Sequence, residues 1–349
     1  MIDVDGEAGG GQIVRSALSL SMLTGTPVHV TNVRGSRPNP GLRPQHLAAV
    51  RAAATCCDAD VEGAKEGSEE VTFEPGDVAG GDIEVDVGTA GSVTLLFDTL
   101  LALSPVLDEP LSVTVTGGTD VKWSPTMAHY RRVKLPLVCR FGFAAEVSLH
   151  RTGFYPAGGG RATLRVDPAT AASAALTERG PLEEVTVHSK AAESLEDADV
   201  ADRQADAAVD ALDDRDLPVG EVVAEYVETS SPGSALLLRA EYRHTVAGFD
   251  ALGERGVTSE TVAERAVDAF DEFREGSGVV DRHTADQLML PLAVGAGRVA
   301  IPAVTDHVET NREVVRAFGG DLRVDRGRDG PVLVSKGGLL DSNERATGG

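Results

Sequence analysis

The sequence predicts an α/β protein built from three repeats of one unit, with a smaller α/β domain inserted between the second and third repeats. Two observations predict this fold. One series of elements occurs three times, over residues 9–73, 91–166 and 283–334. The series consists of a helix rich in small residues, a β-rich run, a Gly/Pro loop, a second helix and a closing β-hairpin. A segment of different character, residues 181–276, separates the second copy from the third. Each copy is longer than the roughly 20 to 50 residues of a solenoid repeat, so we expect subdomains of one body.

The three copies close in the same way. Apolar periodicity predicts an amphipathic second helix in each copy, over residues 46–57, 130–141 and 312–318. A short β pattern follows each of these helices, at residues 60–63, 144–149 and 321–325. Two of the loops that precede these helices hold polar clusters, at residues 34–46 and 305–311. We therefore expect a shared cleft near these loops.

The domain boundaries follow from a loss of pattern. Residues 168–180 lack apolar periodicity, so we assign residues 1–180 and 277–349 to the repeated body and residues 181–276 to the insert. Within the insert the pattern predicts strands at 185–188, 222–227, 235–242 and 246–250, and helices at 195–212 and 259–274. Ser259 is the expected N-cap of the last helix.

The net charge of −23 would, for most chains, argue against a nucleic-acid partner. The charge is uneven, however, because residues 181–276 carry −16 while residues 101–180 carry +3. Of the 32 basic residues 27 are arginine, and this composition is typical of a high-salt cytoplasm. At about 1 M salt the Debye length falls to ~3 Å, so long-range repulsion of a polyanion is screened. The acidity of the insert indicates a solvated surface and does not exclude RNA.

The three cysteines, Cys56, Cys57 and Cys139, form neither a disulfide framework nor a metal-binding knuckle, and we expect them to be buried in a reducing compartment. The sequence contains no apolar stretch near the ~20 residues of a membrane span and no signal-peptide pattern at Met1. These features predict a cytoplasmic protein with no membrane partner. The oligomeric state does not follow from the sequence.

Residues 5–21 place three glycines directly before a helix, an arrangement that can bring backbone N–H groups to a phosphate. Gln12 and Arg15 lie one turn apart on that helix. The loop lacks the lysine of a Walker motif, and a glycine run is more often only a tight turn. A second and weaker loop of this kind spans residues 88–93.

The loop at residues 34–46 gathers cationic and amide side chains. Guanidinium groups match the geometry of phosphate oxygens, and an amide can add a donor. The alternative is a surface turn stiffened by prolines. The residues concerned are Arg34, Arg37, Arg43, Gln45 and His46.

Residues 283–293 predict a helix that starts with Asp286 and Gln287 and continues with an apolar body. Asp286 can be a charge that favours the N-terminus of a helix, or it can recognise a purine together with Gln287. The loop at residues 305–311 then contains His307 beside Thr310 and Asn311. The spacing of the histidines matches no metal motif.

Seven collinear motifs from Ile2 to Val334 together resemble the RNA 3'-terminal phosphate cyclases. These motifs are GGGQIVRSALSLS, RPNPGLRPQHL, GTAGSVTLLFDT, GGTD followed by RRV, GFYPAGGG, HTADQLMLPLA and HVETN. The resemblance implies three β-α-β-α-β-β units and one inserted smaller domain. Enolpyruvyl transferases share the unit but lack the HxxTN histidine, and the second Lys/Arg set that such a small-molecule transferase needs is not found.

The resemblance implies that ATP, Mg²⁺ or Mn²⁺ and RNA 3'-phosphate ends are the ligands, and that His307 becomes covalently adenylylated before AMP passes to the RNA. It also implies ATP or phosphate contacts for other matching residues, namely Gln12, Arg15, Arg34, Arg37, Gln45, Pro125, Asp286 and Gln287. His129 and His283 stand where aromatic neighbours of adenine are familiar.

The chain departs from the family where Ala8 replaces the expected metal-binding glutamate, and Glu7 is the candidate to take over that role. The alternative function is that of a non-catalytic, cyclase-like ribosome-assembly factor, a role associated with relatives that lack the histidine. His307 argues against this alternative.

Overall fold

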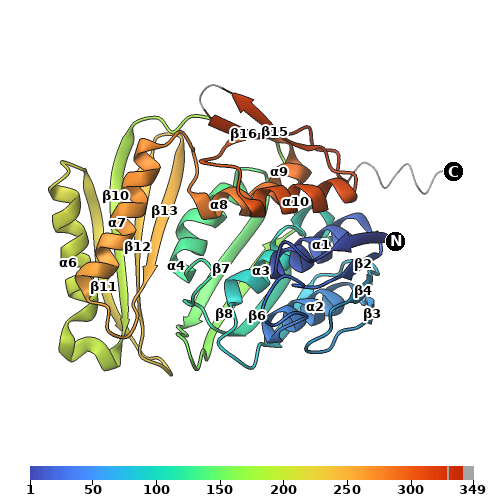
Figure 1. The fold of residues 1–349 in the computed structure, drawn as a ribbon, viewed down its shortest axis with the longest axis horizontal. Coiled ribbons are helices and arrows are strands. Elements are labelled where there is room, and N and C mark those ends of the chain that lie inside the picture. The colour runs from blue at the N-terminus through green and yellow to red at the C-terminus, as the bar shows by residue number, and fades with distance from the viewer. Residues whose placement is uncertain (328–329, 341–349) are drawn as a thin grey trace.

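Three of the four sheets in the computed structural model, which describes residues 1–327 and 330–340, share one strand order (Figure 1). The elements of the first unit are β1 (Ile2–Asp5), α1 (Gly11–Thr24), β2 (Val28–Thr31), α2 (Pro44–Cys57), β3 (Asp60–Glu62) and β4 (Val71–Glu74). Its sheet order is β1-β2-β4-β3, with β1 and β2 parallel and the remaining pairs antiparallel. The α/β class and the β-α-β-α-β-β order expected from the sequence are observed in this unit.

The second unit repeats this order as β5-β6-β8-β7. Its elements are β5 (Gly81–Asp86), α3 (Val93–Leu101), the 3₁₀ turn η1 (Ser104–Val106), β6 (Leu111–Gly117), α4 (Met127–His129), η2 (Tyr130–Lys134), α5 (Leu135–Cys139), β7 (Ala144–Arg151) and β8 (Gly160–Asp167). The single helix predicted over 130–141 is interrupted, because η2 is a π-helical turn directly before Pro136. Proline lacks the N–H of a regular helical bond, which accounts for the wider turn.

The third unit spans the insert. Its first strand, β9 (Ala174–Leu176), precedes the insert and pairs in parallel with β14 (Gly297–Ala300), which follows it. The remaining elements are α8 (Arg282–Gln287), α9 (Met289–Gly295), α10 (Asp306–Ala317), β15 (Leu322–Gly327) and β16 (Gly330–Ser335). The sheet order β9-β14-β16-β15 matches the other two units. The predicted repeat ranges therefore missed the first strand of every unit. One of these strands, β9, lies within residues 168–180, which lack apolar periodicity.

The insert forms its own sheet in the order β11-β10-β12-β13. Its elements are β10 (Leu182–Ala192), η3 (Glu193–Ala198), α6 (Val200–Asp213), β11 (Val219–Val227), β12 (Ser234–Tyr242), β13 (Thr245–Leu252) and α7 (Ser259–Glu275). Helices α6 and α7 pack against this sheet over an apolar cluster separate from the body's core (Figure 1). The predicted N-cap Ser259 is wrong, because Thr258 is the cap and its Oγ1 accepts from the Thr261 N–H at 3.2 Å.

The body has one continuous apolar core to which all three units contribute. Helix α1 lies at its centre, in contact with α2, α3 and α10. Cys56 and Cys57 are buried as expected, and burial raises the pKa of the Cys56 thiol to about 12. Cys139 is exposed, contrary to expectation, because it lies at the end of α5. Among the helices of residues 1–327 and 330–340, none combines the length and apolarity that crossing a bilayer requires.

Replacing Gly297 with alanine tests whether β9 completes the third sheet. A Cβ at Gly297 would lie 1.9 Å from the Ala174 carbonyl oxygen, and the residue has φ +129°. Gly81, which begins β5 with φ +114°, has open space at the same position. Gly297→Ala should therefore cost about 1–3 kcal/mol more unfolding free energy than Gly81→Ala, as overpacking does. Denaturant titration measures both values, and equal losses would contradict the packing of β9 on β14.

Candidate functional site

The glycine loop at residues 9–11 is closely covered by side chains from the loop before α2. Gly10 is the N-cap of α1 with φ +60°, and a Cβ there would lie 3.4 Å from a terminal nitrogen of Arg37. At Gly11 a Cβ would lie only 2.1 Å from Nε2 of His46. Glycine is therefore required at Gly11 by the close approach of the imidazole ring. The two polar loops of the first unit form one surface at the start of α1.

His46 is buried and neutral. Burial, together with the nearby charges of Arg15, Arg34 and Arg43, lowers its pKa to about 3. Its Nδ1 accepts a hydrogen bond from the Arg43 N–H at 3.1 Å, so a neutral ring carries its proton on Nε2, the atom beside Gly11. The sequence motif contains this histidine, but sequence reasoning gave it no role.

Arg34 organises its own loop. One terminal nitrogen donates to the carbonyls of Asn39 at 2.7 Å and Gly41 at 3.1 Å, and the residue has φ +57°. Burial, together with the charges of Arg43 and Arg37, lowers the Arg34 pKa. Arg37, by contrast, is exposed and its guanidinium lies against Gly10. Of these two predicted phosphate ligands, Arg37 has the more accessible donors.

Gln45 connects the first unit to the weaker glycine loop of the second. Its Oε1 accepts from the Ser92 N–H at 3.2 Å, and the Ser92 hydroxyl lies 2.9 Å from that of Thr94. The Thr94 hydroxyl in turn donates to the carbonyl of Pro125 at 3.1 Å. Pro125 itself is buried. The structure thus brings the two glycine loops and the predicted adenine-side proline into one chain of contacts.

A half-buried amide–carboxylate pair and a buried hydroxyl–amide pair join α1 to the third unit. Gln12 donates to the Asp286 carboxylate at 2.9 Å, and the Ser16 hydroxyl donates to the Asn311 side-chain oxygen at 2.8 Å. The Asn311 amide also approaches the Asp286 carbonyl at 3.5 Å. Helices α8 and α10 are therefore held in a fixed position beside the start of α1. Gln287 follows Asp286 on α8, and its buried Oε1 has no hydrogen-bond partner among the described residues.

A cluster of buried charges lies behind this junction. The Lys134 ammonium on η2 donates to Asp98 on α3, and burial lowers the pKa of Lys134 despite this partner. Burial likewise lowers the pKa of Arg15, against the attraction of Asp98 and Asp286. Burial raises the pKa of Asp286, although His307 and Lys134 act in the opposite direction. Sequence reasoning missed both Lys134 and Asp98: Asp98 is the only charge of the apolar helix α3, and Lys134 follows two other basic residues in η2.

His307 lies in a helix rather than in the loop expected from the sequence. Helix α10 begins at Asp306, because the Thr305 hydroxyl caps it by accepting from the Val308 N–H at 3.3 Å. His307 is exposed in the first turn and close enough to Asp286 for their charges to interact. One turn further, Thr310 packs next to the glycine loop, with its Cβ 3.5 Å from the Cβ position of Gly9. An exposed imidazole thus lies one turn before the residue that packs on the glycine loop.

The two predicted adenine neighbours differ in accessibility. His283 is exposed at the start of α8. His129 is buried against Gly248 of β13, and its Nε2 forms an ion pair with Asp281 at 3.5 Å. A base could therefore stack on His129 only after the contact between α4 and β13 opens.

Glu7 has an exposed side chain beside the glycine loop, and its backbone N–H donates to the Asp5 carboxylate at 3.0 Å. Over the described ranges, no group of three or more His, Cys, Asp or Glu side chains could hold a metal ion. Mg²⁺ is commonly held by one or two carboxylates together with substrate phosphates and water. Glu7 and Asp5 fit that mode, in which the protein supplies only part of the ligand set.

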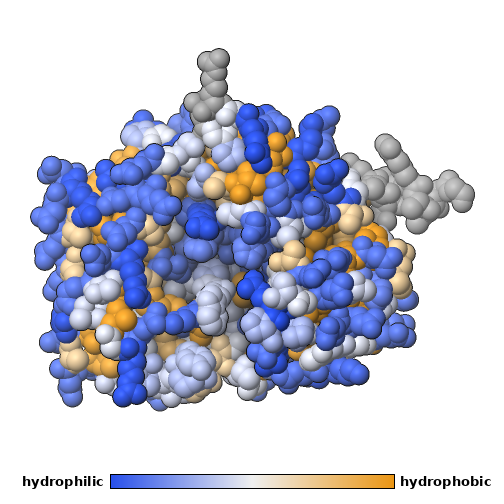
Figure 2. Space-filling model, in the orientation of Figure 1, coloured by the Kyte–Doolittle hydropathy of each residue, from blue (hydrophilic) through white to orange (hydrophobic). Residues whose placement is uncertain are grey.

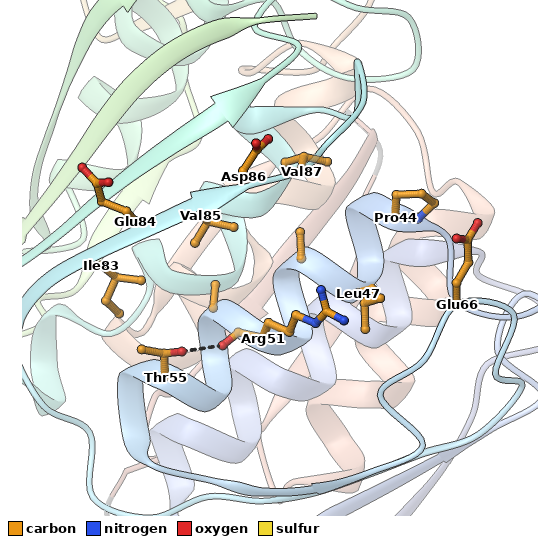
Figure 3. Close-up of a pocket in the computed structure, with 12 residues that line it drawn as sticks. Pro44, Leu47, Arg51, Thr55, Glu66, Ile83, Glu84, Val85, Asp86 and Val87 are labelled. Carbon is orange, nitrogen blue, oxygen red and sulfur yellow. Dashed lines mark hydrogen bonds between the residues drawn. The ribbon is translucent and has the colours of Figure 1, made fainter.

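Two cavities lie away from this junction. One, of about 260 Å³, lies between α2 and β5, with Leu47, Arg51 and Val85 in its lining (Figure 3), and no predicted site residue borders it. The other, of about 640 Å³, is formed by α4, η2 and β7 of the body and by β10 and β11 of the insert. The face shown in Figure 2 is hollowed near its middle, and hydrophilic residues surround the hollow.

Comparisons with known proteins agree on one family. Residues 6–322 match the family described as RNA 3'-terminal phosphate cyclase. A protein of that name from Halobacterium salinarum is 46% identical, over 95% of this chain and 99% of its own length. One from Pyrococcus furiosus is 38% identical, over 99% of this chain and 98% of its own length. One from Ectopseudomonas mendocina is 40% identical over 91% of this chain and 92% of its own. The enolpyruvyl transferase NikO of Streptomyces tendae matches 46% of this chain and 31% of its own, with 16% identity and a TM-score of only 0.28.

The Asp281–His129 pair predicts a pH window of stability. Burial disfavours the charge of Asp281, but His129 and Thr284 outweigh it and lower the Asp281 pKa from 3.8 to about 2. Burial also opposes the charge of His129, yet Asp281 raises its pKa above 6.5. The contribution of Asp281 to the free energy of unfolding is present above pH 3.8 and is lost as the pH falls through about 2. The contribution of His129 to the free energy of unfolding is complete below pH 6.5. It is lost as the pH rises through the pKa of His129 in the folded protein.

Asp281→Asn should therefore reduce the unfolding free energy most between pH 3.8 and 6.5. Denaturant titrations of both proteins across the pH range measure this difference. Asp271→Asn, at an exposed ion pair of α7, is the control and should show little pH-dependent loss. A pH-independent loss for Asp281→Asn would contradict the ionic pairing.

Proposed function

The chain belongs to the RNA 3'-terminal phosphate cyclase family, and we propose that it converts an RNA 3'-terminal phosphate to a 2',3'-cyclic phosphodiester with ATP, through a covalent His307–AMP intermediate. One observation carries this proposal: His307 is exposed in the first turn of α10 near Asp286, and Thr310, one turn further, packs on the glycine loop. The site joins an accessible nucleophile to a set of phosphate donors. The comparisons offer no support for the non-catalytic alternative.

In the first step an imidazole nitrogen of His307 attacks the α-phosphate of ATP, a histidine–AMP bond forms and pyrophosphate leaves. A neutral imidazole is nucleophilic near pH 7, and the resulting phosphoramidate is a good AMP donor. The RNA 3'-phosphate then takes the AMP and frees His307. Finally the adjacent 2'-hydroxyl attacks the activated phosphate, giving the cyclic diester and releasing AMP.

Donors around the glycine loop suit the charge that develops in these steps. The exposed guanidinium of Arg37 and the N-terminus of α1 can bind phosphate oxygens. Arg15 and Gln12 adjoin Asp286 on the neighbouring face of α1. Arg34 and Gln45 hold the surrounding loops through their own hydrogen bonds. Preorganised donors of this kind stabilise a transition state without reorganising during the reaction.

Glu7, with Asp5 beside it, is the proposed protein ligand for Mg²⁺ or Mn²⁺. A bound divalent ion would neutralise the charge of the triphosphate. Asp286, Gln287, His283 and Pro125 remain the proposed surroundings of the nucleotide. Opening of the contact around His129 would be needed to add its ring to that set.

Replacing His307 tests the nucleophile. His307→Ala should abolish covalent, acid-labile labelling by α-labelled ATP, because the variant lacks the attacking nitrogen. Its thermal unfolding should change little, since the side chain is exposed. His150→Ala, at another exposed histidine, is the control and should keep the label. Labelling of His307→Ala at the wild-type rate would overturn the assignment.

Replacing Arg37 tests the phosphate donors. Arg37→Ala should slow cyclisation of a 3'-phosphate RNA by about 1.5–3 kcal/mol in transition-state free energy, the scale of a hydrogen bond to a charged group. Lysine should restore only part of the rate, because it lacks the guanidinium fork. Arg51→Ala, at an arginine of α2 outside the junction, controls for the loss of charge. Equal rates for all three variants and the wild type would remove Arg37 from the site.

A further inference from the structure

Trp123 is the only tryptophan of the chain, and 94% of its surface is exposed. Its backbone lies in the left-handed region, with φ +64°, which is rare for a bulky residue. A single exposed apolar side chain is common on protein surfaces and needs no explanation by itself. What distinguishes Trp123 is the loop that presents it.

The loop that carries Trp123, residues 118–126, is fixed by hydrogen bonds on both sides of the tryptophan. Asp120 accepts from the Met127 N–H at 3.1 Å, and the Thr126 N–H donates to Asp250 of the insert at 2.8 Å. Next to the tryptophan, Lys122 forms an ion pair of 2.7 Å with Glu254 of the insert. The indole ring is therefore held out into solvent by a loop that is bound to both parts of the molecule.

This loop connects the proposed nucleotide site with the larger cavity. Near one end, the Pro125 carbonyl accepts from Thr94, whose hydroxyl contacts the Ser92 loop. On the two sides of Trp123 in the sequence, Asp120 and Thr126 line the 640 Å³ cavity between body and insert. Pro125, which contacts the proposed site through Thr94, is followed in the chain by Thr126, which lines the cavity, so the proposed site and the cavity adjoin at this loop.

The body wall of that cavity is basic although the protein as a whole is acidic. Arg131 and Arg132 of η2 and Arg151 of β7 line this wall. Arg131 and Arg132 are exposed. Among the residues that the structure describes, their side chains have no hydrogen-bond or ion-pair partner. Among the described residues, the Arg151 side chain donates a hydrogen bond only to a neutral group, the Ser230 hydroxyl, at 2.6 Å.

The opposite wall, from the insert, has a different character. It carries Glu193, Glu225 and Glu228, and Lys190 lies 3.8 Å from Glu225 and 3.9 Å from Asp120. An anionic strand would therefore be attracted to the body wall and repelled by the insert wall. The free cations line the body wall, and the exposed aromatic ring is carried by a loop that contributes Asp120 and Thr126 to the same cavity. Cationic grooves with aromatic rings are the usual means of binding single-stranded nucleic acid.

We propose that Trp123 stacks on a base of single-stranded RNA, and that Arg131 and Arg132 bind phosphodiesters of the same strand upstream of its 3' end. This inference rests on the proposed function, because it takes the RNA end to lie in the His307 site. It adds a strand-binding track that the cyclisation chemistry itself does not need. RNA length would then affect binding of the substrate rather than formation of the histidine–AMP bond.

The single tryptophan makes the test direct. The probe is a 12-nucleotide RNA with a 3'-hydroxyl end, which cannot be cyclised, titrated into wild-type protein without ATP. Tryptophan emission should be quenched on binding, because the only emitting indole is the stacking residue. Absence of quenching while the RNA binds, followed by anisotropy of a 5' dye, would overturn the stacking.

Variants separate stacking from charge. Trp123→Ala should weaken RNA binding by about five- to 150-fold, the range of base–aromatic stacking, and Trp123→Phe should restore most of it. Arg131→Ala with Arg132→Ala should reduce the slope of log affinity against log salt by about 0.7 for each lost phosphate contact. Arg165→Ala, whose side chain pairs with Asp167, is the control and should keep the wild-type slope. Wild-type affinity and slope in all variants would overturn the proposal.

The experiments distinguish failure of the strand-binding proposal from failure of the proposed cyclase function. Covalent labelling by α-labelled ATP, without RNA, tests His307 alone. Labelling without tryptophan quenching by RNA would reject the strand-binding track and leave the cyclase function standing. Quenching by RNA without labelling would reject the histidine mechanism and support the track.

Discussion

Two hydrogen-bonded polar pairs between the first and third units, one half-buried and one buried, hold the site together. Gln12 with Asp286, and Ser16 with Asn311, join residues 274 and 295 positions apart in the chain. A buried pair of this kind is costly to break, since the remaining partner loses its hydrogen bond without regaining water. The pairs therefore fix the position of α10, and with it the distance of His307 from the glycine loop. Gly11 is required in turn because the His46 ring approaches its backbone, and Gly10 is favoured by its φ of +60°.

Much of this arrangement could be predicted from the sequence, because its strongest signals are local. The repeat, the glycine loop before α1 and the polar loop before α2 are visible as composition and spacing. Their convergence in one place followed from the expectation that repeated units share a cleft. Predictions from the sequence were wrong where the local pattern was weak and contacts with neighbouring elements determined the structure. Strand β9 has only three residues and is defined by its pairing with β14. In the second unit, the helix predicted before and after Pro136 contains a π-helical turn.

Other features could not be predicted because they depend on contacts across the fold. No pattern in the sequence links Lys134 to Asp98, and their pairing is possible only because η2 packs on α3. His129 is a polar residue in a helix like many others, and only the packing of β13 against α4 buries it beside Asp281. His307 was expected in a loop, since its helix starts with polar residues and a threonine cap rather than with an apolar pattern.

The division of the third sheet by the insert has a consequence for synthesis of the chain. Strand β9 leaves the ribosome roughly 120 residues before β14, the strand with which it pairs. At about 5–20 residues per second this amounts to roughly 6–24 seconds without its partner. All four strands of the insert's sheet and both of its packing helices are made within that interval. The order of translation thus lets the insert complete its core while the domain that contains it is still unfinished.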